Sequence, residues 1–403
     1  MGWCLDCIDC TAMSEKAKSV AILVLAQVTA LSLWFVSSAI LPEMVRESAI
    51  TDARQAALAS AVSAGFVTGA LLSAILGIAD RFDPRRVFAV CVFMSALASL
   101  TLLVLEPGGN TSIFSRFMTG AMLAGVYPVG MKIAVGWGRE DRGLLVGLLV
   151  GALTLGSAAP HLVSWFGGTD WRTVIVVVGG LAAFSGLLIL MIKLGPYHAN
   201  SVSFEAKAIG EAWTNKRVRY AYLGYFGHMW ELYAMWAWVG VIAYASFSFS
   251  IANEEALSLS KLVAFLAIAA GGVGCVLGGY VADRIGKARV TIIAMAVSGL
   301  AAVATAASFG GPVWITVIFI VIWGLAIIPD SPQFSALVAD ASPPEIAGSL
   351  MTLQTAIGFA LTIFTVQAAP LLAGVTGWPT VIIIMALGPL FGIWFMRKLE
   401  TLG

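Results

Sequence analysis

The stretch from Trp171 to Lys193 reads WRTVIVVVGGLAAFSGLLILMIK, and no charged residue stands between Arg172 and Lys193. A helix needs about 20 mostly apolar residues to cross the hydrocarbon core of a bilayer. The apolar residues here are continuous rather than alternating, which favours a membrane-spanning helix over a strand of a membrane β-barrel. A helix also pairs the backbone polar groups within the segment, as lipid requires.

Eleven further segments share this character, so twelve spans are predicted. They are 19–41, 55–78, 85–105, 112–136, 143–166, 218–247, 259–281, 288–309, 312–338, 347–372 and 375–396. Of the 403 residues, 60% are hydrophobic and only 11% are charged, whereas a soluble chain carries about 25% charged residues. We therefore expect an all-α membrane protein with twelve transmembrane helices and the lipid bilayer as its surroundings.

The charge distribution predicts the orientation of the chain. If the N-terminus is cytoplasmic, all but five of the 23 Lys and Arg residues lie at or near the inner face, as the positive-inside rule requires. The exceptions are Arg46, Arg54, Arg116, Arg172 and Lys261. Both termini are thus expected in the cytoplasm, with the protein in a bacterial cytoplasmic membrane. The net charge of +1 gives no field that would attract nucleic acid.

The N-terminal segment carries the unusual run Cys4, Cys7 and Cys10. Zinc or an iron–sulfur cluster needs a fourth ligand nearby, and none is present, so no metal site is expected. Translation starting at Met13 instead of Met1 is the alternative interpretation of this segment. The first span is too long and too polar for a cleavable signal peptide.

The second half of the chain repeats the first at an offset of about 200 residues. Asp80-Arg81 after the second span recurs as Asp283-Arg284 after the eighth, and Gly120 and Pro128 recur as Gly324 and Pro332. Two six-helix halves are therefore predicted, and parallel repeats of this kind flank a central cavity in secondary transporters. The predicted divisions are a lead-in over 1–18, halves over 19–193 and 218–396, a cytosolic linker over 194–217 and a tail over 397–403.

The loops after the second and eighth spans resemble a signature of the major facilitator superfamily, G-x-x-x-D-x-x-G-R-K/R. The second copy, Gly279-Tyr-Val-Ala-Asp283-Arg284-Ile-Gly286-Lys287, fits it well, whereas the first, Gly77-Ile-Ala-Asp80-Arg81-Phe-Asp83-Pro84, departs from it. The resemblance covers about residues 15–398. It implies a conformational lock formed by Asp80, Arg81, Asp283, Arg284 and Lys287.

Two further motifs resemble the same family. Arg116-Phe-Met-Thr-Gly120 is similar to its R-x-x-x-G motif, which implies a role for Arg116 in proton handling. Snorkelling of Arg116 to the interface is the alternative. Gly151, Gly156 and Pro160 match part of the family's antiporter motif, which favours export slightly. Gly143, Gly147 and Gly151 have the spacing that permits close helix packing.

Ionisable residues inside a membrane are candidates for function. His228 and Glu231 stand three residues apart in GYFGHMWELYAMWAW and share a helix face with Met235 and Trp238. Either could take up a proton near neutral pH, as a proton-driven cycle requires. A His–Glu hydrogen bond that only joins helices is the alternative.

Asp330 stands between Pro329 and Pro332, with Gln333 beside it. Two prolines disrupt the helical hydrogen bonds, which lipid does not tolerate unless the segment lies beside a cavity or a protein neighbour. Asp330 is therefore a candidate for both proton coupling and solute binding, and a helix cap is its alternative role. The predicted solute-binding set is Trp34, Tyr127, Trp230, Tyr233, Asp330, Gln333 and Gln354.

These features predict a secondary transporter that moves a small organic solute by alternating access, driven by an ion gradient, with protons as the expected ion. No nucleotide-binding loop of the G-x-x-x-x-G-K-[ST] type is present, and no enzyme motif such as H-E-x-x-H or G-x-S-x-G appears, so neither an enzyme nor a cofactor is expected. Aromatic faces suit flat organic molecules or cations. A proton-coupled uptake symporter, an anion or organic-acid exchanger and a non-transporting solute sensor are the alternatives. A monomer is expected.

Overall fold

The computed structural model describes residues 3–138, 141–168, 170–198 and 207–402. Within these ranges the chain is helical and has no strand, which confirms the prediction of an all-α protein. Eleven of the described segments are long and apolar enough to cross a membrane. The side chains of Cys4, Cys7 and Cys10 lie outside the described part, and its remaining residues contain no metal-binding cluster.

The N-terminal half of the chain contains the helices α1 to α9. Their bounds are α1 Trp3–Leu31, α2 Val36–Glu47, α3 Asp52–Leu76, α4 Ile78–Arg81, α5 Pro84–Leu100, α6 Asn110–Leu123, α7 Tyr127–Val135, α8 Arg142–Phe166 and α9 Trp171–Leu188. Short 3-10 turns at Thr101–Leu103 and Ile189–Met191 extend α5 and α9.

The C-terminal half contains the helices α11 to α17, preceded by the short α10. Their bounds are α10 Lys207–Thr214, α11 Lys216–Phe247, α12 Asn253–Ile285, α13 Lys287–Ser308, α14 Val313–Ala326, α15 Ser331–Ala341, α16 Pro344–Thr376 and α17 Trp378–Glu400. The segment predicted as a linker thus includes a helix, α10, which packs against α11 and α16.

The helix α11 completes the count of twelve. Its 32 residues span about 48 Å at 1.5 Å per residue, and it packs against α12, α15, α16 and α17. Glycine, His228, Glu231 and several tyrosines and tryptophans interrupt its apolar character. These residues make α11 less apolar than the other eleven spans. It nevertheless lies inside the bundle as the twelfth.

Three spans are broken inside the membrane, and two of the breaks occupy equivalent places in the two halves. Helix α6 ends at Leu123 and α7 begins at Tyr127, whereas α14 ends at Ala326 and α15 begins at Ser331. The second residues of α7 and α15 are Pro128 and Pro332, where the missing N–H of proline leaves no helical bond unmade. The third break, between α1 and α2, has no proline, and of the three breaks only the one beside Asp330 was predicted.

Glycines allow close helix contacts at the equivalent positions Gly120 and Gly324. A Cβ atom on Gly120 would lie 1.9 Å from the carbonyl oxygen of Val62 on α3, and one on Gly324 would lie 2.0 Å from that of Ala267 on α12. The predicted packing role of Gly143, Gly147 and Gly151 is wrong, because a Cβ at these positions would meet no atom within 4 Å.

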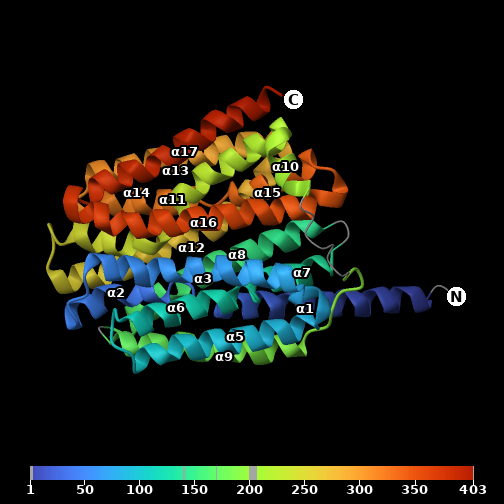
Figure 1. Cartoon of the computed structure of the whole chain (residues 1–403), viewed down its shortest axis with the longest axis horizontal. Helices are drawn as coiled ribbons and strands as arrows, with labels where there is room; N and C mark the ends of the chain where they lie inside the picture. The colour runs from blue at the N-terminus through green and yellow to red at the C-terminus, as the bar shows by residue number, and fades with distance from the viewer. Residues whose placement is uncertain (1–2, 139–140, 169, 199–206, 403) are drawn as a thin grey trace.

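Figure 1 shows α1 to α9 on one side of the molecule and α11 to α17 on the other, with the N- and C-termini at the same end. We call this end the terminal end and the opposite end, where α2 lies, the α2 end. Helices α3 and α16 pack together across the two halves, as do α8 and α12. The shared end of the two termini agrees with an even number of spans, whereas its cytoplasmic location stays a prediction.

Candidate solute cavity and buried charges

A cavity of about 120 Å³ lies between the two halves of the chain. Helices α7 and α8 line it from the N-terminal half, and α11, α15 and α16 line it from the C-terminal half. Its lining residues are Tyr127, Met131, Val146, Val150, Leu153, Tyr225, Met229, Leu232, Tyr233, Ile328, Ser331, Pro332, Ser335, Thr355 and Phe359. Three tyrosines, two methionines and three hydroxyl side chains thus surround a mostly apolar space, and none of these lining residues is charged.

The helix α11 turns a different face to the cavity than the sequence predicted. Tyr225, Met229, Leu232 and Tyr233 line the cavity, and their spacing of four, seven and eight residues is that of one helix face. The neighbouring face carries His228 and Glu231, which turn toward α13, α14 and the start of α15. Tyr225, Met229 and Leu232 were not predicted. Their helical spacing with Tyr233 was a signal for one cavity face, but the prediction was based on His228 and Glu231 beside them.

Tyr127 and Tyr233 are the members of the predicted solute-binding set that line the cavity. Trp34 lies behind the lining, with its ring 5.7 Å from Tyr233 and 5.5 Å from Phe359 between ring centroids. For Trp230 the prediction is wrong in this conformation, because its Nε1 donates to the carbonyl oxygen of Ile384 on α17 at 2.9 Å.

Gln333, Gln354 and Asp330 are also absent from the cavity lining. Gln354 is fully buried, and neither polar atom of its amide has a hydrogen-bond partner. Asp330 lies in the second layer, because its chain neighbours Ile328 and Ser331 line the cavity while its own side chain is about 2% exposed. These three residues belong to the wall of the cavity rather than to its surface.

Asp330 and His228 form a buried pair. Nδ1 of His228 lies 3.0 Å from Oδ1 of Asp330, and the two side chains are 1% and 2% exposed. The predicted pairing of His228 with Glu231 is therefore replaced by one with Asp330. Asp330 makes no side-chain helix cap, which removes its alternative role. The ring of Tyr225 stacks beside His228 at 5.9 Å and separates it from the cavity.

Glu231 accepts hydrogen bonds from two other helices. Ser298 Oγ of α13 lies 2.9 Å from Oε2, and Trp323 Nε1 of α14 lies 2.8 Å from Oε1. Glu231 is 1% exposed, and Ser298 and Trp323 are buried as well. A carboxyl group this deep is costly to ionise unless its oxygens are hydrogen-bonded, and both oxygens are.

Arg116 is fully buried and does not snorkel. Its Nη2 donates to the carbonyl oxygens of Leu33 at 2.9 Å and Trp34 at 2.8 Å, in the break between α1 and α2. A broken helix frees carbonyl groups that lipid cannot satisfy, so Arg116 stabilises this break. Its Nε and Nη1 have no hydrogen-bond partner.

An aromatic cluster closes the cavity on the side of the α2 end. It consists of Trp34, Phe35, Phe66, Tyr233, Trp236 and Phe359, with ring centroids as close as 4.7 Å between Phe66 and Phe359. The first three rings come from the N-terminal half and the others from the C-terminal half. The two halves are therefore in contact on the α2-end side of the cavity.

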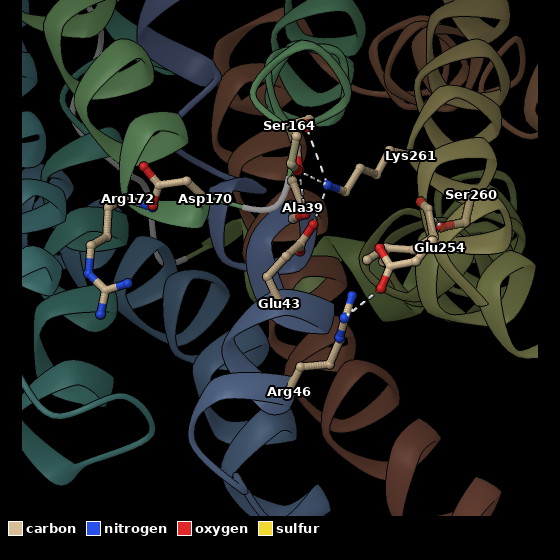
Figure 2. A network of polar contacts seen from close by, with 11 residues as sticks. Ala39, Glu43, Arg46, Ser164, Asp170, Arg172, Glu254, Ser260 and Lys261 are labelled. Atoms are coloured by element: carbon tan, nitrogen blue, oxygen red, sulfur yellow. Dashed lines mark hydrogen bonds and ion pairs between the residues drawn. The ribbon is translucent and has the colours of Figure 1, made fainter.

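Polar contacts join the halves nearer the α2 end, as Figure 2 shows. Lys261 of α12 forms an ion pair with Glu43 of α2, and their side chains are only 5% and 4% exposed. The ammonium group of Lys261 also donates to the carbonyl oxygens of Ser164, at 3.3 Å, and Gly168. A second pair, Arg46 to Glu254 at 2.8 Å, lies in the open with side-chain exposures of 49% and 69%.

The residues of the predicted conformational lock lie near the terminal end. Lys287 pairs with Asp340 at 2.5 Å, and the guanidinium of Arg284 lies 3.5 Å above the ring of Tyr280. Both contacts remain within the C-terminal half. Arg81 and Asp283 are exposed, and the side chain of Asp80 lies outside the described part. A lock between the halves at these residues stays a prediction for another conformation.

Comparisons with known proteins agree with this architecture. Residues 23–365 match the family model of the Major Facilitator Superfamily. A probable nitrate/nitrite transporter, NarK2 of Mycobacterium tuberculosis, is 24% identical over 328 residues, which cover 76% of this chain and 78% of that protein.

Solved structures share the fold at low sequence identity. A D-xylose-proton symporter has a TM-score of 0.76 at 14% identity, over 95% of this chain and 98% of its own. The nucleoside transporter NupG has a TM-score of 0.74 at 16% identity, over 95% and 99% of the two chains. Because the family model covers most of the sequence and the fold has the cavity and paired halves described above, the chain belongs to the major facilitator superfamily and is an integral membrane transporter.

Proposed function

We propose that this protein moves a small organic solute through the cavity between its halves, driven by a proton gradient. The observation that carries the proposal is the position of the buried ionisable groups. Asp330 and His228 lie behind the cavity lining, Glu231 bonds to α13 and α14 on the neighbouring face of α11, and all three side chains are shielded from solvent in this conformation. A coupling group must be buried, must change its charge and must reach water from alternate sides, and the burial of these ionisable side chains supports the proposal.

The cavity lining favours a neutral or cationic solute with a flat or apolar body. Tyrosine and methionine side chains bind such groups through their polarisable surfaces, and tyrosine rings attract cations. The relative NarK2 is named as a nitrate/nitrite transporter, but an anion would be favoured by fixed positive charge, and no cation is among the lining residues. Anion exchange is therefore the second candidate, supported only by that relative and by the buried Arg116.

With the terminal end in the cytoplasm, the conformation is closed toward the outside by the Glu43–Lys261 pair and the aromatic cluster. The partial antiporter motif on α8 favours export slightly over uptake. A sensor that does not transport is the alternative of a different class, and a counterflow assay in proteoliposomes with a panel of neutral, cationic and anionic solutes distinguishes it from a transporter.

Replacement of Glu231 by Gln tests the coupling. Glu231→Gln keeps the shape of the side chain and removes its titration, so gradient-driven accumulation is expected to stop while counterflow at equal pH continues. Asp330→Asn then separates two roles, since loss of solute binding marks a solute-binding carboxylate and loss of coupling alone marks part of the proton path. Accumulation by Glu231→Gln with unchanged pH dependence would show that Glu231 is structural.

A further inference from the structure

The hydroxyl group of Ser298 has two alternative acceptors. Its Oγ lies 2.9 Å from Oε2 of Glu231 and 3.2 Å from the carbonyl oxygen of Met295, one turn earlier on α13. A serine hydroxyl carries one proton and can accept hydrogen bonds as well as donate one. Ser298 therefore donates to only one of these oxygens at a time, and rotation about its Cβ–Oγ bond exchanges them.

The other partner of Glu231 has no such freedom. Trp323 Nε1 lies 2.8 Å from Oε1, and an indole N–H is a donor only. A proton placed on Oε1 would find no acceptor in Trp323, whereas a proton placed on Oε2 would find Ser298 Oγ. The geometry thus distinguishes the two carboxyl oxygens, and Oε2 is the one that can bear the proton.

We propose that Ser298 is a hydroxyl switch that keeps Glu231 hydrogen-bonded in both its ionised and its protonated form. In the ionised form Ser298 donates to Oε2. When Glu231 takes up a proton from water, an O–H bond forms on Oε2 and donates to Ser298 Oγ, and the serine hydroxyl turns its own proton to the carbonyl oxygen of Met295. Ser298 gains and loses no proton, and no heavy atom has to move.

Neutral groups hold the Glu231 carboxylate, because the cations of the neighbouring helices pair with other carboxylates. His228, three residues before Glu231 on α11, pairs with Asp330, and Cys275 of α12 donates to the carbonyl oxygen of Ile328. Lys261 of α12 is paired with Glu43, and Arg289 of α13 is paired with Glu400 of α17. Since these cations are held elsewhere, Ser298 and Trp323 are the groups that position and stabilise the Glu231 carboxylate, and Ser298 is a positioning residue for proton uptake.

This inference rests on the proposed function only for its use in transport, and infrared difference spectroscopy tests it without transport. The C=O stretch of protonated Glu231 is identified in the purified full chain as the band that Glu231→Gln removes. Because an O–H that donates a hydrogen bond lowers the C=O frequency, Ser298→Ala is expected to raise this frequency and Ser298→Thr to restore it. Ser185→Ala is the matched control, because Ser185 is also buried but bonds only the carbonyl oxygen of Ala182, on its own helix α9.

The pH titration of the same band gives a second result. Trp323→Phe removes a donor that favours the ionised form, so the midpoint is expected to rise by about one pH unit. Ser298→Ala removes a bond from both forms and is expected to raise the midpoint by less. Trp238→Phe is the control for the indole, because Trp238 is buried and donates to Val366.

An unchanged C=O frequency in Ser298→Ala, or a midpoint shift as large as that of Trp323→Phe, would show that Ser298 is a fixed donor and overturn the proposal. If Ser298→Ala does not fold, Ser298→Cys serves instead, since a thiol is a weaker partner in both directions and should raise the frequency to a smaller degree. If Ser298→Ala shifts the C=O band but transport does not depend on pH, the proposed proton coupling is refuted and the hydroxyl switch is supported. If transport is proton-coupled but the band does not shift, the switch is refuted and the coupling is supported.

Discussion

The Glu43–Lys261 pair is expected to be the main polar contact that holds the two halves closed at the α2 end. Lys261→Met would leave the carboxylate of Glu43 buried without a cation, and its oxygens have no other hydrogen-bond donor. Breaking a buried pair in this way costs about 3–5 kcal/mol. In a conformation with α2 and α12 apart, water would reach Glu43, so most of this cost falls on the closed conformation alone.

The size of the expected shift between closed and open conformations follows from this difference in the cost of an unpaired Glu43. A cost of about 3–5 kcal/mol corresponds to a shift of roughly two to four orders of magnitude in the ratio of closed to open molecules. Glu43→Gln should shift the ratio less, because Lys261 keeps its hydrogen bonds to the carbonyl oxygens of Ser164 and Gly168. Arg46→Gln is the matched control, since its pair with Glu254 is exposed and such pairs contribute at most about 1 kcal/mol.

Distances between spin labels measure this equilibrium. Labels at the exposed positions Thr51 and Asn253, in a chain whose other cysteines have been replaced, report the separation of the halves at the α2 end. Lys261→Met is expected to convert a short distance into a predominantly long one, while Arg46→Gln leaves it short. If Lys261→Met and Arg46→Gln give the same distance distribution, and both variants keep the thermal stability of the parent, the buried pair does not hold the halves together.

Three further predictions concern packing, topology and the predicted lock. Gly324→Ala should lower stability by about 3 kcal/mol or more, because its Cβ would collide with the backbone of Ala267. Gly147→Ala should unfold at or above the parent's temperature, since its Cβ meets no atom within 4 Å. Equal melting temperatures of the two variants would contradict this prediction. An impermeant thiol reagent added from outside should label a cysteine at Glu254 but not one at Arg284, and the reverse result would invert the predicted orientation. Asp283→Asn should shift the halves toward the inward-open arrangement by about 0.3–1 kcal/mol, measured with labels at the terminal end; no shift would leave the Asp283 loop as a signal of topology only.

Much of the fold was determined by local sequence. The apolar stretch after Arg172 specifies a spanning helix because any other backbone would leave polar groups unpaired in lipid. Pro128 and Pro332 specify the paired helix breaks because proline lacks an N–H and its ring disfavours a continuous helix. Gly120 and Gly324 marked the repeat, and helices touch backbone to backbone at both positions. These features depend on a residue and its near neighbours in the chain, so they can be found without the structure.

Only the tertiary structure decided which of the buried polar groups meet. His228 and Glu231 lie three residues apart, yet His228 pairs with Asp330, about one hundred residues later, and Glu231 bonds Ser298 and Trp323 on two other helices. Neither Ser298 nor Lys261 stood out in the sequence, since a serine in a span is ordinary and Lys261 was counted only as an exception to the charge rule. The physical reason is that the hydrophobic effect does not drive helices together in lipid, so the rotation of α11 is set by packing and hydrogen bonds with its neighbours. That packing turns Tyr225 toward the cavity and Glu231 away from it.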